Sequence, residues 1–180
     1  MLENIKLSDR VNKIQPFYVM ELLARARQLE AGGRSIVHME IGEPDFPTPE
    51  PVVLAGRAAL DQGLTRYLPA TGLPELKMRI AAYYSSRYGL ALDPARVIVT
   101  PGSSGALQLV MSVLIDPGDS VLISDPGYPC NRHFVRTLEG IPRSMAVGPE
   151  TNYQPTAELV AHHWTEHCKG LLVASPANPT

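Results

Sequence analysis

Three short segments of this sequence carry residue types that could bind a ligand, and the first lies at 101–106. Gly102, Ser103 and Ser104 follow an apolar run and precede a helical pattern. Small side chains at a helix start let an anion approach backbone N–H groups, where the helix dipole also favours negative charge. The segment lacks the spacing of a dinucleotide-binding or nucleoside-triphosphate loop. A plain strand-to-helix turn with serine capping explains the same residues equally well.

The second and third segments each present one side chain after an apolar run. Tyr128 stands between two prolines, and a rigidly held aromatic ring can stack on a planar ligand. Asn178 follows the apolar run 171–174, and its amide can bind a phenolate oxygen or a carboxylate. A surface turn is the plainer interpretation of each motif taken alone. Two bonds in these segments are candidates for the cis form, Asp125-Pro126 and Asn178-Pro179.

A fourth pattern, from His163 to His167, matches the HxxEH spacing of some zinc proteases. On one helix these two histidines would share a face and could bind one metal ion. Only Cys168 and Ser175 follow as ligand or catalytic candidates, and no acidic residue lies beyond Glu166. An amphipathic helix is therefore the favoured interpretation. We expect no metal site, and a zinc hydrolase ranks last among the functions considered.

The order of apolar runs and helical patterns indicates what positions these segments. The short apolar runs predict strands at 97–99, 121–123, 144–147 and 171–174. Helical patterns separate them at 104–115, 131–139 and 156–168. This alternation predicts an α/β fold with a mainly parallel sheet. Ligands in such sheets bind beyond the carboxyl ends of the strands, which is where the three segments lie.

The N-terminal half of the chain carries a different pattern. Apolar stripes and first-turn prolines predict helices at 17–31, 51–62 and 74–88, and alternation predicts a short strand at 36–41. Gly32 and Gly33 would end the first of these helices. A turn-rich connector follows the strand at 42–49, where three prolines prevent regular structure.

Composition narrows the function classes. The 180 residues are 44% hydrophobic and 19% charged, with a net charge of −2, as in an ordinary globular protein. Without a run of basic residues, nucleic acid and anionic membranes are unexpected partners. The polar start is unlike a signal peptide, and the most apolar stretch, 107–115, is too short to span a bilayer. Two cysteines, Cys130 and Cys168, are too few for a disulfide scaffold, which favours the cytoplasm.

Taken together, the motifs resemble those of the class I/II aminotransferases, the aspartate-aminotransferase-like group of fold type I pyridoxal-phosphate enzymes. The resemblance covers the chain from Leu7 to Thr180. Its motifs occur in the family's order at Ile41–Phe46, Tyr67–Leu76, Val99–Leu107, Asp125–Pro129 and Ser175–Thr180. The resemblance implies an incomplete three-layer α/β/α large domain with an N-terminal helical arm. Residues 1–45 would form the arm and the start of a small domain, and 46–180 the N-terminal half of the large domain.

The resemblance also implies roles for individual residues. Gly102, Ser103 and Ser104 would bind the phosphate of pyridoxal 5′-phosphate through backbone N–H groups. Tyr128 would stack on its pyridine ring, and Asn178 would bond its 3′ oxygen and face the substrate. The backbone of Gly42 would approach the carboxylate of the substrate. Tyr67 would reach the cofactor phosphate of the neighbouring subunit in a homodimer.

The family's catalytic lysine has no counterpart in this chain. The lysine that forms an imine with the cofactor lies beyond the Asn-Pro-Thr motif in the family, as does the aspartate that pairs with the pyridinium nitrogen. The sequence holds only four lysines, none in a matching context: Lys6, Lys13, Lys77 and Lys169. Pyridoxal chemistry needs both groups. We therefore expect a chain of these residues to be catalytically inactive and to bind cofactor weakly or not at all.

The function that this resemblance implies is transfer of an amino group from an α-amino acid to an α-keto acid. Two alternatives keep the same motifs. A carbon–sulfur β-lyase or related eliminase would share the cofactor, and an aminotransferase-like sensor domain would use the fold without catalysis. The sequence does not name the amino acid or the keto acid.

Overall fold

The computed structural model describes residues 6–180. Contacts between Cα atoms divide them into two compact units. One unit consists of the residues up to Ile36 together with Ser104–Thr180, and the other is Val37–Ser103. The predicted boundary between residues 45 and 46 concerns a different division, into arm and large domain, and it stays a prediction.

The first unit contains a three-stranded sheet with the order β2-β1-β3. The strands are β1 (Ser120–Asp125), β2 (Ile141–Ala146) and β3 (Cys168–Leu172). Both pairs are parallel, with Val121 opposite Pro142 on one side and Gly170 on the other. The predicted parallel α/β arrangement is thus confirmed for these strands.

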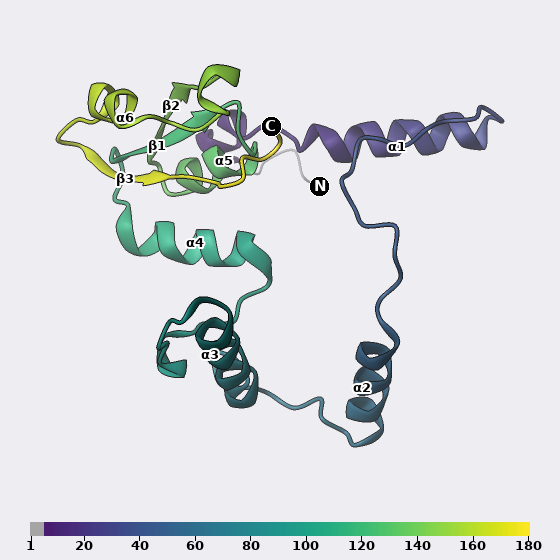
Figure 1. Ribbon diagram of the computed structural model, residues 1–180. Helices are drawn as coiled ribbons and strands as arrows, with labels where there is room; N and C mark the ends of the chain where they lie inside the picture. The colour runs from purple at the N-terminus through teal and green to yellow at the C-terminus, as the bar shows by residue number, and fades with distance from the viewer. Residues whose placement is uncertain (1–5) are drawn as a thin grey trace. The chain divides into compact units, whose positions relative to one another are not determined.

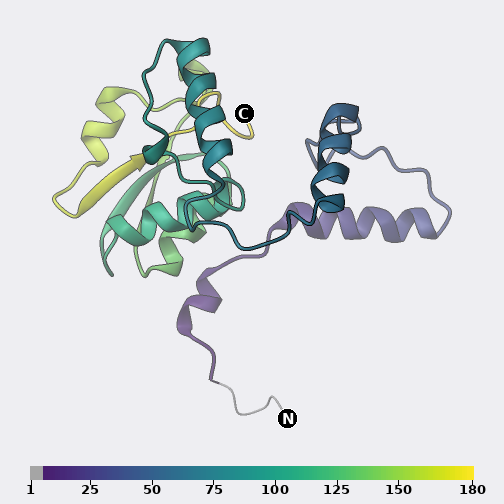
Figure 2. The ribbon, with the colours of Figure 1, turned by 90° about the horizontal axis from the view of Figure 1, so that it is seen from below.

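Helices cover both faces of this sheet, because the side chains of β1 alternate between them. Val121 and Ile123 pack on one face against Met111 of α4 (Gly102–Leu114) and Val135 of α5 (Cys130–Thr137). Leu122 packs on the other face, against side chains of α6 (Ala157–His163). Figure 1 shows α6 above the strands and α4 below them, and Figure 2 shows α4 on the near side.

The N-terminal part of the first unit consists of a short 3-10 turn, η1 (Asp9–Lys13), and helix α1 (Tyr18–Ala31). The predicted helix at 17–31 is confirmed, and Gly32 follows its last residue. The sequence pattern did not predict η1. None of the residues of α1 is buried. No helix within residues 6–180 combines the length and apolarity needed to cross a membrane.

The second unit consists of helices joined by extended segments. They are α2 (Glu50–Asp61), α3 (Pro74–Tyr88) and the 3-10 turn η2 (Pro94–Arg96). The two long helices were predicted, and each has a proline in its first turn. Helix α3 ends at Gly89, whose φ of 68° is the left-handed conformation that glycine adopts readily.

Three sequence predictions of secondary structure were wrong. Residues 36–41 and 97–99 are not strands, because neither segment pairs with another strand in the described part of the chain. In the segment 97–99, the N–H of Val99 donates to the carbonyl oxygen of Thr71 at 3.0 Å, but this bond is not part of a strand ladder. The helix predicted at 156–168 ends at His163, and the 3-10 turn η3 (Pro149–Thr151) precedes it.

The two outer strands of the sheet differ in how their edges are protected. Pro142 lies within β2 and cannot donate a ladder hydrogen bond, which is characteristic of an edge strand. Strand β3 has no such residue, and no described strand pairs with its outer edge. An unprotected edge next to apolar surface favours pairing with another chain. Beside it, Trp164 and Val173 keep 47% and 45% of their surface exposed.

This exposed edge predicts that the 180-residue chain self-associates. We expect Trp164→Lys, which places a charge beside the edge, to lower the association constant several-fold, while Trp164→Phe leaves it nearly unchanged. Multi-angle light scattering over a concentration series measures this. A strictly monomeric wild-type chain at all concentrations would contradict the prediction.

Candidate functional site

The order of the strands creates a crevice at one edge of the sheet. The chain leaves β1 toward β2 on one side and then crosses to β3 on the other. At such a reversal, the loops beyond the carboxyl ends of the two strands diverge and leave room for a ligand. A hollow lies at this position, between the ends of β1 and β3. The residues lining it are Ser124, Pro126, Gly127, Tyr128, Asn131, Tyr153, Leu172, Ala174, Ala177 and Asn178.

The loop after β1 presents Tyr128 through a tight turn. A Cβ atom on Gly127 would stand 2.5 Å from the carbonyl oxygen of Ser124, so the turn has no space for a side chain there. Arg132, in the first turn of α5, places Nη2 3.6 Å from Oδ1 of Asp125. This ion pair is partly exposed and contributes at most about 1 kcal/mol. The turn geometry therefore depends mainly on the missing side chain of Gly127.

The environment of Tyr128 disfavours ionisation of its phenol. The hydrogen bond with the thiol of Cys130, followed by partial burial, raises the pKa of Tyr128 above its usual value of 10.0. The ring also meets the ring of Phe17 edge to face, with centroids 6.0 Å apart and planes at 70°. At neutral pH, Tyr128 thus offers an uncharged aromatic ring.

The chain after β3 brings Asn178 to the same hollow. The Nε2 group of Gln154 donates to the carbonyl oxygen of Ala174 at 3.0 Å, which ties the start of this segment to the loop before α6. The side chain of Asn178 is exposed, so its amide is accessible. The bonds Asp125-Pro126 and Asn178-Pro179, both candidates from the sequence, are cis, and Ser175-Pro176 is cis as well.

Sequence reasoning missed two residues of this hollow, Asn131 and Tyr153. Tyr153 follows β2, and both it and Asn152 have positive φ angles, 55° and 51°. A bulky residue in the left-handed region is uncommon. The position of Tyr153 in the sequence could have identified it, because the loop after β2 also lies beyond the carboxyl end of a parallel strand.

The segment predicted to bind phosphate begins helix α4. Gly102 has a φ of 70°, and no atom lies within 4 Å of the position that its Cβ would occupy. Thr100 accepts the N–H of Gly102 through its carbonyl oxygen and donates its hydroxyl to the carbonyl of Gly102, at 2.7 and 2.8 Å. Ser103 and Ser104 are exposed, and the N–H groups of a first helical turn have no intrahelical acceptors. Gly102 and Ser103 belong to the second unit, and Ser104 is not among the residues lining the hollow.

The two remaining predicted site residues also lie in the second unit. Tyr67 is fully exposed, at 107% of the reference surface, and helps line a hollow of about 530 Å³ near Arg66 and Leu73. Gly42 is exposed, with open space where a side chain would project. Both residues are thus accessible, and their roles stay predictions.

The hollow at Tyr128 and Asn178 is too small to enclose a ligand by itself. Its volume is about 20 Å³. Pockets that bury a small ligand measure roughly 300–1,000 Å³. What the hollow supplies is an aromatic ring and a carboxamide, which suit the face and the phenolate oxygen of a pyridine ring.

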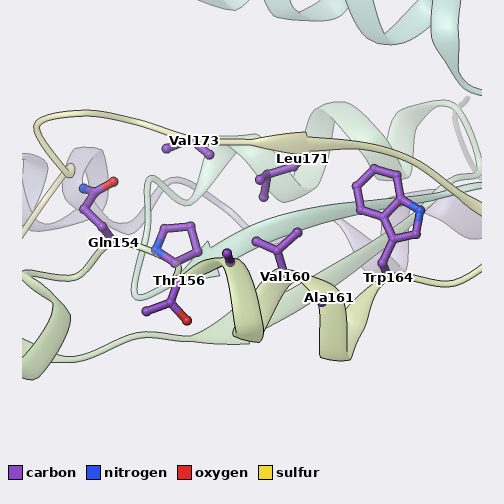
Figure 3. A pocket seen from close by; sticks show the side chains of 9 residues that line it. Gln154, Thr156, Val160, Ala161, Trp164, Leu171 and Val173 are labelled. Atoms are coloured by element: carbon purple, nitrogen blue, oxygen red, sulfur yellow. The ribbon is translucent and has the colours of Figure 1, made fainter.

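A larger groove between α6 and β3 has the wrong chemistry for such a ligand. It measures about 480 Å³, and its labelled side chains in Figure 3 are mostly apolar, with Val160, Trp164 and Leu171 facing one another. Its two polar side chains already have partners. Gln154 donates to Ala174, and the hydroxyl of Thr156 accepts the N–H of Leu159 at 3.2 Å. The groove therefore offers few polar groups to a phosphorylated ligand.

The structure separates the two histidines of the HxxEH pattern. Helix α6 ends at His163, whose Nδ1 lies 2.9 Å from the carbonyl oxygen of Leu159. His167 follows in a turn, so the two imidazoles do not share a helix face. Within residues 6–180, no three side chains of His, Cys, Asp or Glu group so that they could hold a metal ion.

The close approach at Gly127 predicts that Gly127→Ala distorts the turn that presents Tyr128. We expect the free energy of unfolding to fall by about 1–3 kcal/mol, as for other forced overpacking. Gly170→Ala is the matched control, because no atom lies within 4 Å of its Cβ position. Urea denaturation of both variants measures the difference. Equal stabilities of the two variants would contradict the requirement for glycine at position 127.

Comparison with known proteins places this geometry in a family. Residues 34–180 match the model of the family described as Aminotransferase class I and II. A valine–pyruvate aminotransferase of Mycobacterium tuberculosis is 39% identical over 97% of this chain. A (5-formylfuran-3-yl)methyl phosphate transaminase of Methanocaldococcus jannaschii is 38% identical over 96% of it.

Solved structures show the same fold. The aspartate aminotransferase of Thermus thermophilus, solved with maleate, matches 98% of this chain with a TM-score of 0.92 and 37% identity. This chain covers 46% of that structure and 45% of each of the two curated relatives, less than half of their length. The predicted aspartate-aminotransferase-like α/β fold is confirmed. The chain belongs to the class I and II aminotransferase family.

Proposed function

We propose that this chain supplies one wall of the cofactor site of an aminotransferase that uses pyridoxal 5′-phosphate. The enzyme would move an amino group from an α-amino acid to an α-keto acid. The observation that carries this proposal is that Tyr128 and Asn178, which are 50 positions apart in the sequence, line one hollow at the reversal of strand order. Family membership supports the reaction class.

The residues present fit the cofactor. Tyr128 offers a neutral ring of the size of a pyridine, and the amide of Asn178 can donate to a phenolate oxygen. Gly102, Ser103 and Ser104 leave the first N–H groups of α4 open to a phosphate. When bound, pyridoxal phosphate supplies the electron sink that amino transfer needs.

Each residue has a physical task in this proposal. Tyr128 excludes water from one face of the cofactor ring and limits its rotation. The amide of Asn178 would donate a hydrogen bond to the 3′ oxygen of the cofactor and so favour the phenolate form of that oxygen. The backbone of Gly42 would approach the substrate carboxylate, and Tyr67 would reach the phosphate site of a second subunit in a homodimer. A cytoplasmic location, expected from two unpaired cysteines, completes the proposal.

None of the lysines in the first unit lines this hollow. Lys169 stands at the amino end of β3, the end away from the hollow, with Nζ 3.7 Å from Oδ2 of Asp119. Lys13 lies in η1 and is exposed, and neither it nor Lys6 lines the hollow. In the second unit, Nζ of Lys77 donates to the hydroxyl of Thr71 at 3.0 Å. We propose that the lysine that anchors the cofactor is not one of these four.

This assignment predicts that the 180-residue chain does not catalyse amino transfer. We expect no keto acid to form from a panel of α-amino acids with 2-oxoglutarate and added pyridoxal phosphate. Borohydride treatment followed by peptide mapping should find no single modified lysine. Turnover, or an adduct confined to one lysine, would contradict the assignment.

The proposed wall also predicts the effect of its two side chains on cofactor affinity. We expect Tyr128→Ala to weaken binding of pyridoxal phosphate by about two- to tenfold, the worth of one aromatic pair. Asn178→Ala should have an effect of the same order, since it removes one hydrogen bond. Equilibrium dialysis at millimolar cofactor measures both, with Gln28→Ala, which removes an exposed amide that does not line the hollow, as the control. Unchanged affinity in both variants would contradict the proposal that Tyr128 and Asn178 contact the cofactor.

A further inference from the structure

The N-terminal segment is fastened to the C-terminal end of α5 by two arginines that point in opposite directions. Arg10 donates from Nη1 to the carbonyl oxygen of Thr137 at 2.8 Å and from Nη2 to Oε1 of Glu139 at 2.9 Å. In return, Arg136 donates from Nη1 to the carbonyl oxygen of Lys13 at 2.8 Å. The two segments therefore hold each other through three hydrogen bonds.

Physical chemistry favours this location for the contacts. The last carbonyl groups of a helix lack intrahelical donors, and cations near them interact favourably with the helix dipole. The planar fork of an arginine can serve a carbonyl and a carboxylate at once in a fixed geometry, whereas a lysine offers a compact charge on a flexible stem. The side chains of Arg10 and Glu139 are 43% and 56% exposed, so the ion pair alone contributes little. The position of the N-terminal segment on α5 is fixed by the three reciprocal hydrogen bonds together.

The same segment reaches Tyr128 at the other end of α5. Phe17 lies four positions after Lys13, and four extended residues span at most about 14 Å. From Arg136 back to Cys130, α5 rises about 9 Å. The segment is thus long enough to follow the helix from its end to its start, where Phe17 meets the ring of Tyr128 at 6.0 Å.

We propose that Phe17 is a positioning residue for the ring of Tyr128, and that Arg10 and Arg136 determine where Phe17 stands. The edge-to-face contact restricts the rotation of Tyr128 about its side-chain bonds before a ligand arrives. A ring that is already ordered loses less entropy on stacking. The effect on cofactor rests on the proposed function, whereas the packing itself does not.

The packing is tested without cofactor by NMR of the 180-residue chain labelled with ¹³C-tyrosine. Tyr128→Phe assigns the ring signal of Tyr128. We expect Phe17→Leu, which keeps an apolar side chain but removes the ring, to shift that signal, and Arg10→Ala to shift it in the same direction. Phe17→Tyr should restore it. Arg25→Ala is the control, because Arg25 is exposed on α1 and its Nη1 donates to Oε1 of the nearby Gln28 at 3.4 Å.

The outcomes separate this inference from the proposed function. A Tyr128 signal that Phe17→Leu leaves unmoved overturns the positioning role, and one that Arg10→Ala leaves unmoved overturns the role of the arginines. With pyridoxal phosphate added, Phe17→Leu should weaken binding about two- to tenfold. If both variants move the signal but millimolar cofactor does not affect it in the wild-type chain, positioning stands and the proposed function fails.

Discussion

The burial of the central strand β1 is the interaction on which the candidate site depends. Leu122 is fully buried toward α6, and Val121 and Ile123 are 3% exposed toward α4 and α5. Burying one such side chain stabilises the fold by about 1.5–3 kcal/mol. Because β1 pairs with a parallel strand on each side, its two neighbours must be reached by crossovers on opposite faces. The reversal of strand order, and with it the hollow, follows from this position of β1.

The hollow gains its chemistry from details of the loops that follow these strands. Gly127 lets the backbone turn back on Ser124, which presents Tyr128 at the rim. Gln154 ties the segment after β3 from the opposite side, close to Asn178. The N-terminal segment then supports Tyr128 from outside through Phe17. The proposed wall is therefore built on the sheet, with contacts from three parts of one unit supporting its loops.

The sequence predicted the elements whose signals are local. Strands around 121–123, 144–147 and 171–174 have continuous apolar runs, and the helices have stripes and first-turn prolines, so they could be placed within a few residues. The apolar runs 36–41 and 97–99 carry the same signal but are not strands. A strand exists only through its partner, and no described segment pairs with either. The helix predicted at 156–168 extends too far because Cys168 fits the buried row of a helix. In the structure Cys168 is instead the first residue of β3.

The candidate site shows the same division. Tyr128 and Asn178 could be named because both follow recognisable strands. Tyr153 was missed because no motif marks it, although its loop lies at the same edge. The contacts of Arg10 with Thr137 and Glu139 join residues 127 and 129 positions apart. No local pattern contains such a pairing, since it depends on how an extended segment folds over a helix.

The central claim is that the loops after β1 and β3 form one binding wall for the ring of pyridoxal phosphate. Mapping the backbone amide signals of the ¹⁵N-labelled chain during a titration with pyridoxal phosphate tests it most directly. The account predicts that the largest shifts occur at Gly127, Tyr128 and Asn178, and that inorganic phosphate alone does not reproduce them. Shifts confined to the groove of Val160 and Trp164, or an absence of shifts at Tyr128 and Asn178 under saturating cofactor, would contradict it.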